Sequence, residues 1–199
     1  MEVTLNINGH NQLINAHPTD TLMNALRGAG YFSVRFGSHG GETGAAAVLV
    51  DGKLVSSEVM LVGQAVGHPI ETVESLTGRV GELHPIQRAF IETGAIQSGY
   101  STPAMILAAK ALLDHTLNPT EAEIRDALSG VLCRETGYIK PVEASSAPPP
   151  TCAAKSSLPT LARTSSMPAT SSKRLPAMRA MIIRSSQVQV TEYAIRNTQ

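Results

Sequence analysis

The order of short periodic segments in the first 73 residues is the feature that most limits how this chain can fold. Val3, Leu5 and Ile7 alternate with polar residues, which is the period of a half-buried strand. The Asn8-Gly9 pair that follows is a strong hairpin signal, and residues 12–15 are expected to form the return strand. The chain is therefore predicted to begin with a β-hairpin.

A helix is expected directly after this hairpin. Thr19 or Asp20 can cap its N-terminus, and Gly28 and Gly30 are expected to end it. Its inner face is expected to hold four apolar residues, namely Leu22, Met23, Ala25 and Leu26.

A glycine-rich stretch without a visible period comes next, over residues 33–44. Three short strands are then expected, over residues 47–50, 53–55 and 70–73, with a turn at Asp51-Gly52 between the first two. A ββαββ order with a glycine-rich loop after the helix suggests a β-grasp arrangement, in which a mixed sheet wraps over one helix.

Beyond about residue 82 the pattern becomes helical. His84-Pro85 opens a helix that places Ile86 and Phe90 on one face, and a second helix is expected over residues 103–113, with proline at its favoured first position. A third begins after Thr120, which has capping-box spacing to Glu123. We therefore predict an α+β protein, a β-grasp domain followed by a small helical bundle.

The composition changes sharply near residue 144. Residues 1–144 hold 15 acidic and 9 basic residues and all 16 glycines, whereas residues 145–199 hold 1 acidic and 7 basic residues, 10 Ser and 6 Pro. Such a stretch buries too little apolar surface to offset its ordering entropy. We predict domains over 1–77 and 78–144, followed by a disordered Ser/Pro/Arg-rich tail over 145–199.

Several classes of protein are excluded by the same composition. No apolar run approaches the roughly 20 residues of a membrane span, and the N-terminus lacks the charged start and apolar core of a signal peptide. Cys133 and Cys152 cannot form a disulfide framework, which favours a reducing, cytoplasmic location. The acidic folded part, which has few aromatic residues, argues against nucleic-acid binding.

Four collinear motifs resemble one protein family. Residues 37–52 resemble the first cluster loop of the small iron–sulfur subunit of the xanthine dehydrogenase (molybdenum hydroxylase) family, and residues 83–90 resemble its first bundle helix. Residues 94–107 resemble its second cluster loop and the helix after it, and residues 119–138 resemble its closing segment. Within this family, the chain resembles the Cys-poor N-terminal domain of probable hypoxanthine oxidases of the selenium-associated xanthine dehydrogenase type.

The resemblance implies eight ligand positions, because each half in that family binds a [2Fe–2S] cluster on four Cys thiolates. In the first half the matching positions are Ser38, Thr43, Ala46 and Glu58. In the second half they are Ser98, Ser101, Cys133 and Glu135. One thiol therefore remains at eight positions.

This loss of thiols governs the chemistry expected of the chain. Iron in such clusters is held by soft thiolate, whereas a Ser hydroxyl titrates far above the roughly 8.5 of a thiol and Ala46 has no donor atom. Glu58 and Glu135 offer only hard carboxylate oxygens. We therefore expect neither a bound cluster nor another metal.

Individual residues leave alternatives open. Cys133 is either a remaining ligand or a buried small apolar residue, and burial is expected. His39 could bind a metal together with Glu42 and Glu58, although a solvated loop histidine is favoured. His84 precedes a proline at a helix start, so a capping or packing role is expected.

Gln97 is the residue with the clearest role implied by the resemblance. In the family, the second loop approaches the molybdopterin cofactor of the large subunit, and the resemblance places Gln97 where it can hydrogen-bond that cofactor. The alternative is a loop Gln that bonds local backbone, and the sequence favours neither.

The function expected from the resemblance is that of a degenerate iron–sulfur subunit or domain. It would dock on the molybdenum-binding large subunit of a xanthine dehydrogenase-type oxidoreductase, as a structural part with no catalytic residue of its own. One alternative is an active [2Fe–2S] electron carrier with unusual ligands, and another is a β-grasp interaction module outside such a complex. The tail suggests a further hypothesis, that a frame change truncated a longer protein and left a non-functional fragment.

Overall fold

A computed structural model of the chain describes residues 1–77 and 82–146. The predicted tail over 145–199 lies outside the described residues, apart from Ser145 and Ser146. The hypothesis of a frame change therefore stays a prediction, as do the domain boundaries at 77/78 and 144/145.

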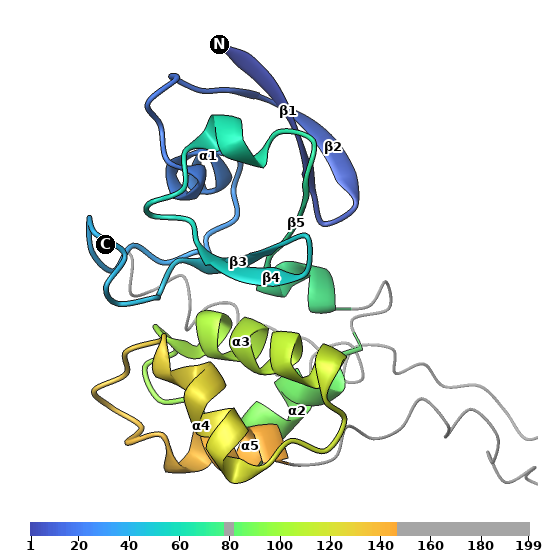
Figure 1. Cartoon of the computed structure of the whole chain (residues 1–199), viewed down its shortest axis with the longest axis vertical. Helices are drawn as coiled ribbons and strands as arrows, with labels where there is room; N and C mark the ends of the chain where they lie inside the picture. Colours follow the sequence, from blue (N-terminus) through green and yellow to red (C-terminus); the bar gives the residue numbers. More distant parts are fainter. Residues whose placement is uncertain (78–81, 147–199) are drawn as a thin grey trace, which may run out of the picture. The chain divides into compact units, whose positions relative to one another are not determined.

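The N-terminal part is a mixed five-stranded sheet, as predicted (Figure 1). Its strands are β1 (Glu2–Ile7), β2 (His10–Asn15), β3 (Ala47–Val50), β4 (Lys53–Ser56) and β5 (Pro69–Glu71). The spatial order is β2-β1-β5-β3-β4, with β1 parallel to β5 and the other neighbouring pairs antiparallel. The central β5 therefore joins two hairpins that are far apart in the sequence.

Both hairpin turns use left-handed residues, in agreement with the sequence signals. Asn8 and Gly9 have φ of 54° and 79°, and Asp51 and Gly52 have φ of 51° and 75°. This conformation matches the twist of the flanking strands. The Asn8 side chain also exchanges two hydrogen bonds with Thr72, of 2.9 and 3.0 Å, so the first turn is fixed to the end of β5.

Helix α1 (Leu22–Gly28) buries the four apolar residues that were predicted for its inner face. The predicted cap was wrong, however, because Thr21 is the N-cap and its hydroxyl accepts the N–H of Asn24 at 3.3 Å. Asp20 instead accepts the N–H of His17 at 2.6 Å. Several consecutive polar residues can each cap a helix, and the sequence did not rank them.

The C-terminal part is a bundle of α2 (Pro85–Glu92), α3 (Thr102–His115), α4 (Glu121–Ser129) and α5 (Ile139–Ser146). The capping predictions are confirmed: Nδ1 of His84 accepts the N–H of Ile86, and Thr120 and Glu123 form a capping box. Among residues 1–77 and 82–146, no helix has both the length and the apolar character that crossing a membrane requires.

Helix α5 was not predicted. It contains Pro141 and two serines, and with these residues its sequence shows no clear helical pattern of apolar residues. Pro141 is tolerated because it lies in the first turn, and the Ser145 hydroxyl donates back to the carbonyl of Pro141 at 2.7 Å. Val142 and Ala144 are buried, so α5 completes the core of the bundle.

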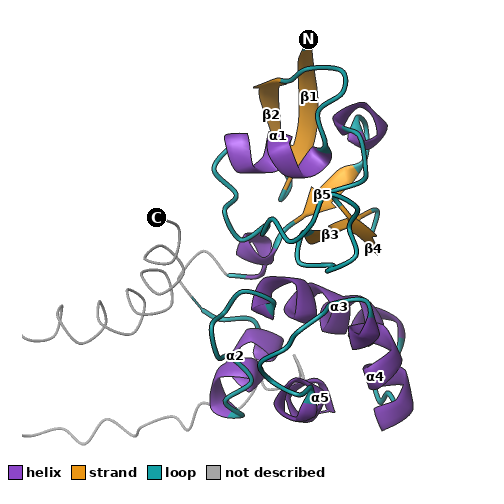
Figure 2. Ribbon diagram, turned by 90° about the vertical axis from the view of Figure 1, so that its left-hand side faces the viewer, coloured by secondary structure: helices purple, strands orange, loops and turns teal. Residues whose placement is uncertain are grey.

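Strand β3 contributes to two hydrophobic cores, one on each face of the sheet. Ala47 and Leu49 pack with residues of the four helices, whereas Val48 and Val50 pack with α1 and with β1. Both views show α3 running along the β3–β4 side of the sheet (Figures 1 and 2). All four residues of β3 are buried, which explains its continuous apolar sequence.

Candidate functional site

The first loop, residues 37–46, is closed by a carboxylate from the segment after β4. Glu58 is only 4% exposed. Its Oε1 accepts the backbone N–H of Gly37 at 2.6 Å and that of Ser38 at 3.1 Å. Two of the four first-loop ligand positions, Ser38 and Glu58, are therefore in direct contact.

The other two positions, Thr43 and Ala46, belong to the loop itself. A Cβ on Gly37 would come within 1.8 Å of Oγ1 of Thr43, so only glycine fits beside that hydroxyl. Ala46 is fully buried, and its carbonyl accepts the Ser57 hydroxyl at 2.6 Å. Groups of the first loop thus make hydrogen bonds within the protein. One of the four ligand positions, Ala46, has no side-chain donor atom.

The second loop, residues 97–101, meets the segment 133–136, and its four ligand positions form two pairs. The backbone N–H of Ser98 donates to Oε2 of Glu135 at 3.0 Å. The hydroxyl of Ser101 hydrogen-bonds Sγ of Cys133, which also accepts the hydroxyl of Thr136 at 3.3 Å. The predicted positions 98, 101, 133 and 135 are therefore brought together from distant parts of the chain.

The surroundings of Cys133 differ from the expected apolar burial. Cys133 is only partly buried, although it packs against the core of the helical bundle, so the prediction of a buried apolar residue is met only in part. Burial raises the pKa of its thiol, but hydrogen bonds from Ser101, Thr136 and nearby backbone N–H groups outweigh this, and the pKa lies below its usual value. A lower pKa makes the thiolate more accessible here than it is for an unperturbed thiol.

Two residues that support the Cys133 site were not identified from the sequence. The Tyr138 hydroxyl accepts the N–H of Cys133 at 2.9 Å and donates to the carbonyl of Val131 at 3.0 Å. Thr136 contacts the sulfur directly. Neither residue stands at a ligand position, and hydroxyl side chains carry no periodic signal that could have marked them.

The two loops are linked to each other. The Tyr100 hydroxyl donates to the carbonyl of Phe36, and the N–H of Leu132 donates to the carbonyl of Thr43 at 2.8 Å. The guanidinium of Arg35 lies 5.8 Å from the Tyr100 ring centroid, a distance at which a cation is attracted to the ring face. The structure thus fixes the first loop against the second.

The remaining predicted residues lie at the surface. Gln97 is exposed beside Ser98, and its proposed contact with a cofactor of another subunit stays a prediction. His39 is exposed, as expected, and packs edge-on against Phe36 with ring centroids 5.1 Å apart. Glu42 is exposed and Glu58 is buried. A metal bound by His39, Glu42 and Glu58 would therefore need carboxylates from two different environments.

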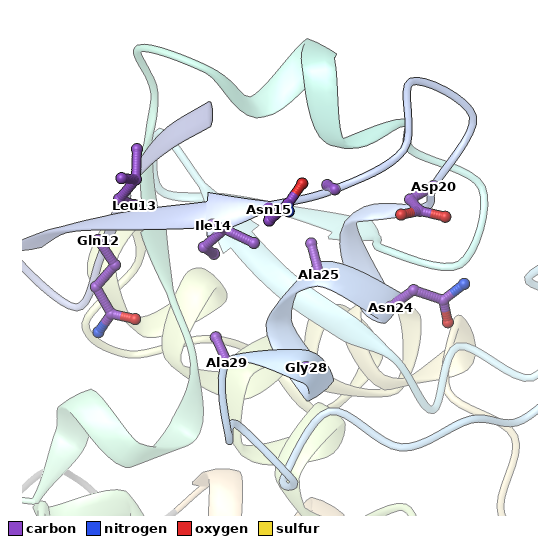
Figure 3. A pocket seen from close by; sticks show the side chains of 10 residues that line it. Gln12, Leu13, Ile14, Asn15, Asp20, Asn24, Ala25, Gly28 and Ala29 are labelled. Atoms are coloured by element: carbon purple, nitrogen blue, oxygen red, sulfur yellow. The ribbon is translucent and has the colours of Figure 1, made fainter. Parts of the chain in front are cut away.

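A cavity of about 330 Å³ lies elsewhere, between β2 and α1 (Figure 3). Asn15, Asp20 and Asn24 give it a polar rim, and Ile14 and Ala25 give it an apolar floor. None of the eight ligand positions lines it. It therefore does not belong to the candidate iron–sulfur site.

Comparisons with known proteins identify the family. Residues 72–146 match the family described as "[2Fe-2S] binding domain". The nicotinate dehydrogenase small FeS subunit of Eubacterium barkeri is 45% identical over 139 residues, which cover 69% of this chain and 88% of that protein. The chain belongs to the iron–sulfur subunits of xanthine dehydrogenase-type molybdenum hydroxylases.

Other members of this family agree with that placement. The "probable hypoxanthine oxidase" of Escherichia coli K12 is 35% identical over 139 residues, 69% of this chain and 14% of that protein. Quinoline 2-oxidoreductase from Pseudomonas putida 86 has a TM-score of 0.71 and 34% identity, over 74% of this chain and 91% of that one. The predicted family and fold are therefore confirmed.

The same comparisons correct the cofactor prediction. We expected no bound cofactor, but the matching family is one of [2Fe–2S] binding domains and the E. barkeri relative is an FeS subunit. These findings indicate a [2Fe–2S] cluster. The expectation was wrong because it rested on the chemistry of each single side chain. It did not include the effect of a fold that keeps the ligand positions together.

The two halves fit such a cluster to different degrees. The first loop does not fit, because Ala46 has no donor and Glu58 is engaged with backbone N–H groups. The second half fits better, because Cys133 offers a sulfur donor whose pKa is lowered, and Ser98, Ser101 and Glu135 offer oxygen donors around it. It is also the half that the family of [2Fe–2S] binding domains matches.

Proposed function

We propose that this chain is the iron–sulfur subunit of a xanthine dehydrogenase-type molybdenum hydroxylase and that it binds one [2Fe–2S] cluster in its helical half. Cys133, Ser98, Ser101 and Glu135 are the residues that would hold the cluster. Such a cluster supplies one-electron transfer at a potential tuned by its ligands and their hydrogen bonds. The proposed partner is a separate molybdenum-binding large subunit.

The observation that carries this proposal is the convergence of the four second-half positions. They come from two segments more than thirty residues apart in the sequence and still meet in two hydrogen-bonded pairs. Thr136 and Tyr138 fix the Cys133 backbone and sulfur from the other side. Groups held in place by outer contacts of this kind are typical of metal ligands.

The chain's own residues also supply a docking surface. Gln97 is exposed on the second loop, next to the paired positions. Its amide can both donate and accept hydrogen bonds, so it suits a polar cofactor held by the partner. We propose that this loop faces the large subunit.

Metal analysis of the purified chain tests the cluster. After anaerobic reconstitution, we expect iron, acid-labile sulfide and visible absorbance, all of which Cys133→Ala should greatly reduce. Cys152→Ala is the matched control, because it removes the only other cysteine of the chain, and it should keep the iron. A reconstituted chain that stays colourless and free of iron would overturn this part of the proposal.

A pull-down with a molybdenum-binding large subunit of the same enzyme type tests the docking. The chain should bind the large subunit, and Gln97→Ala should weaken binding by about tenfold, the loss expected for one or two hydrogen bonds. His10→Ala, at an exposed position of β2, is the control and should bind normally. A failure of the unaltered chain to bind any such subunit contradicts the docking role.

A further inference from the structure

Glu58 has contacts that the proposed function does not use. It is the one carboxylate among the buried residues that the structure describes. Its Oε1 accepts two backbone N–H groups, whereas its Oε2 is buried and accepts no hydrogen bond from any described residue. Burying a charge is costly unless it is paired or hydrogen-bonded, so its position needs an explanation.

The two donors to Glu58 belong to consecutive residues. Successive backbone N–H groups that point at one place form a concave anion site, a geometry that proteins use for phosphate and iron–sulfur groups. Here Gly37 and Ser38 direct their N–H groups at one carboxylate oxygen. Glu58 therefore occupies, from within the chain, the place that an anionic group would take in this loop.

The rest of the loop closes tightly around the same contacts. Gly37 packs against the Thr43 hydroxyl, and a Cβ on Gly41 would lie 2.8 Å from Oγ of Ser56. Gly41 also has a left-handed φ of 79°. The loop thus keeps a path around Glu58 that depends on glycine.

We propose that the Glu58 carboxylate is an internal anion that replaces a first-loop cluster and keeps the four first-loop ligand positions together. This inference goes beyond the proposed function, which concerns the second half, and it does not depend on it. It explains why a loop with no thiol retains glycines at positions where a side chain would not fit.

Amide hydrogen exchange at Gly37 and Ser38 provides the first test. Glu58→Ala should speed exchange at both amides by about tenfold or more, because both donors lose their acceptor. Glu58→Gln keeps an acceptor oxygen and should have a much smaller effect. Glu74→Ala is the matched control, since Glu74 accepts the N–H of Ser33 at 3.2 Å, four residues before Gly37, and it should leave exchange at Gly37 and Ser38 unchanged.

Two outcomes of this exchange experiment contradict the proposal. One is unchanged exchange at Gly37 and Ser38 in Glu58→Ala. The other is equal acceleration in Glu58→Gln and Glu58→Ala, which would mean that the hydrogen-bond acceptor is irrelevant. If Glu58→Ala does not fold, amide exchange at Gly37 and Ser38 in Glu58→Gln is compared with exchange in the unaltered chain. A small acceleration is then the expected result.

Restoring the thiols provides the second test. A variant with Ser38→Cys, Thr43→Cys, Ala46→Cys and Glu58→Cys should gain about one [2Fe–2S] cluster per chain over the unaltered chain, because four thiolates complete such a site. The variant that keeps Glu58 and has the other three changes should gain less. No gain in iron from the fourfold variant contradicts the claim that the positions are kept together.

The two proposals can fail separately. The iron content of the unaltered chain and its loss in Cys133→Ala test the second half. The difference in iron between the unaltered and fourfold variants tests only the first loop.

Discussion

The first and second loops of this protein differ in the residues at their predicted ligand positions, and the contacts made at these positions differ as well. In the first loop, Glu58 is buried and accepts backbone N–H groups, so the loop is closed on itself. In the second, Cys133 remains and stays partly accessible, with hydroxyl groups directed at its sulfur. The first loop is closed around one buried carboxylate, and the second presents a set of donors around a partly accessible sulfur.

The difference concerns the acceptors that the backbone N–H groups of each loop meet. Buried backbone donors that converge in a loop need an acceptor such as an anion, or the loop must take another path. Glu58 supplies that anion in the first loop. In the second loop Glu135 accepts the N–H of Ser98 but is exposed, so it leaves the surroundings of Cys133 open.

The largest expected effect tests whether the two loops belong to one cooperative unit. Leu49 of β3 is fully buried in the core that it shares with the helices. Leu49→Ala should reduce the free energy of unfolding by about 2–5 kcal/mol. Denaturant unfolding followed by Tyr fluorescence and by circular dichroism should show one coincident transition for both halves.

Two separate transitions would mean that the loops can be compared only as parts of independent domains. Leu13→Ala is the control, since Leu13 is 67% exposed on β2. It should change the stability by less than about 0.5 kcal/mol.

A somewhat smaller effect is expected at the contact between the first loop and the helical part. Gly44 has a φ of 63°, and a Cβ there would lie 2.0 Å from the carbonyl oxygen of Gly130. Gly44→Ala should therefore cost about 2–4 kcal/mol, from left-handed strain and from the clash with backbone. Thermal and denaturant unfolding measure this loss.

Gly52→Ala is the matched control for the contact. Gly52 also has a left-handed φ, of 75°, but open space around it, so only the strain of about 1–2 kcal/mol is expected. Equal losses in the two variants would show that the contact with Gly130 does not hold the first loop.

The smallest expected effect concerns the helical part alone. Burial and the nearby charge of Lys110 lower the pKa of His84 in the folded protein, against the opposing effect of Asp114. The folded state then binds a proton less readily than the unfolded chain, so stability falls as the pH drops below about 6.5. His84→Asn keeps a capping group without this titration.

The stability of His84→Asn should therefore depend less on pH than that of the unaltered protein. Because His84 is partly solvated, the difference should not exceed about 1 kcal/mol between about pH 7.5 and pH 5. Unfolding measured at both pH values checks it, and a steeper pH dependence in the variant would contradict the lowered pKa.

The parts of the fold that carry local signals could be predicted from the sequence. Asn8-Gly9 and Asp51-Gly52 predicted their turns, and the inner face of α1 followed from its period. Helix α5 was missed because Pro141 and two serines hide a helix that is stabilised by burial of Val142 and Ala144. Tertiary contacts of this kind leave no periodic trace.

The candidate site was predictable only as a set of positions. The family resemblance named eight positions, but it did not reveal that Glu58 would bind backbone N–H groups or that Thr136 would contact the Cys133 sulfur. These contacts depend on loops whose paths are set by packing and not by local sequence. The same limit explains why the cofactor prediction failed.

The double role of β3 has a consequence for exchanging parts between relatives. Its odd positions face the helices and its even positions face α1 and β1, so one four-residue strand belongs to both halves. A chimera that takes its helical half from another subunit would inherit partners shaped for different side chains at Ala47 and Leu49. In a chimera that folds, β3 would have to come from the same subunit as the helices. This β3 would also have to fit the sheet that comes from the other subunit.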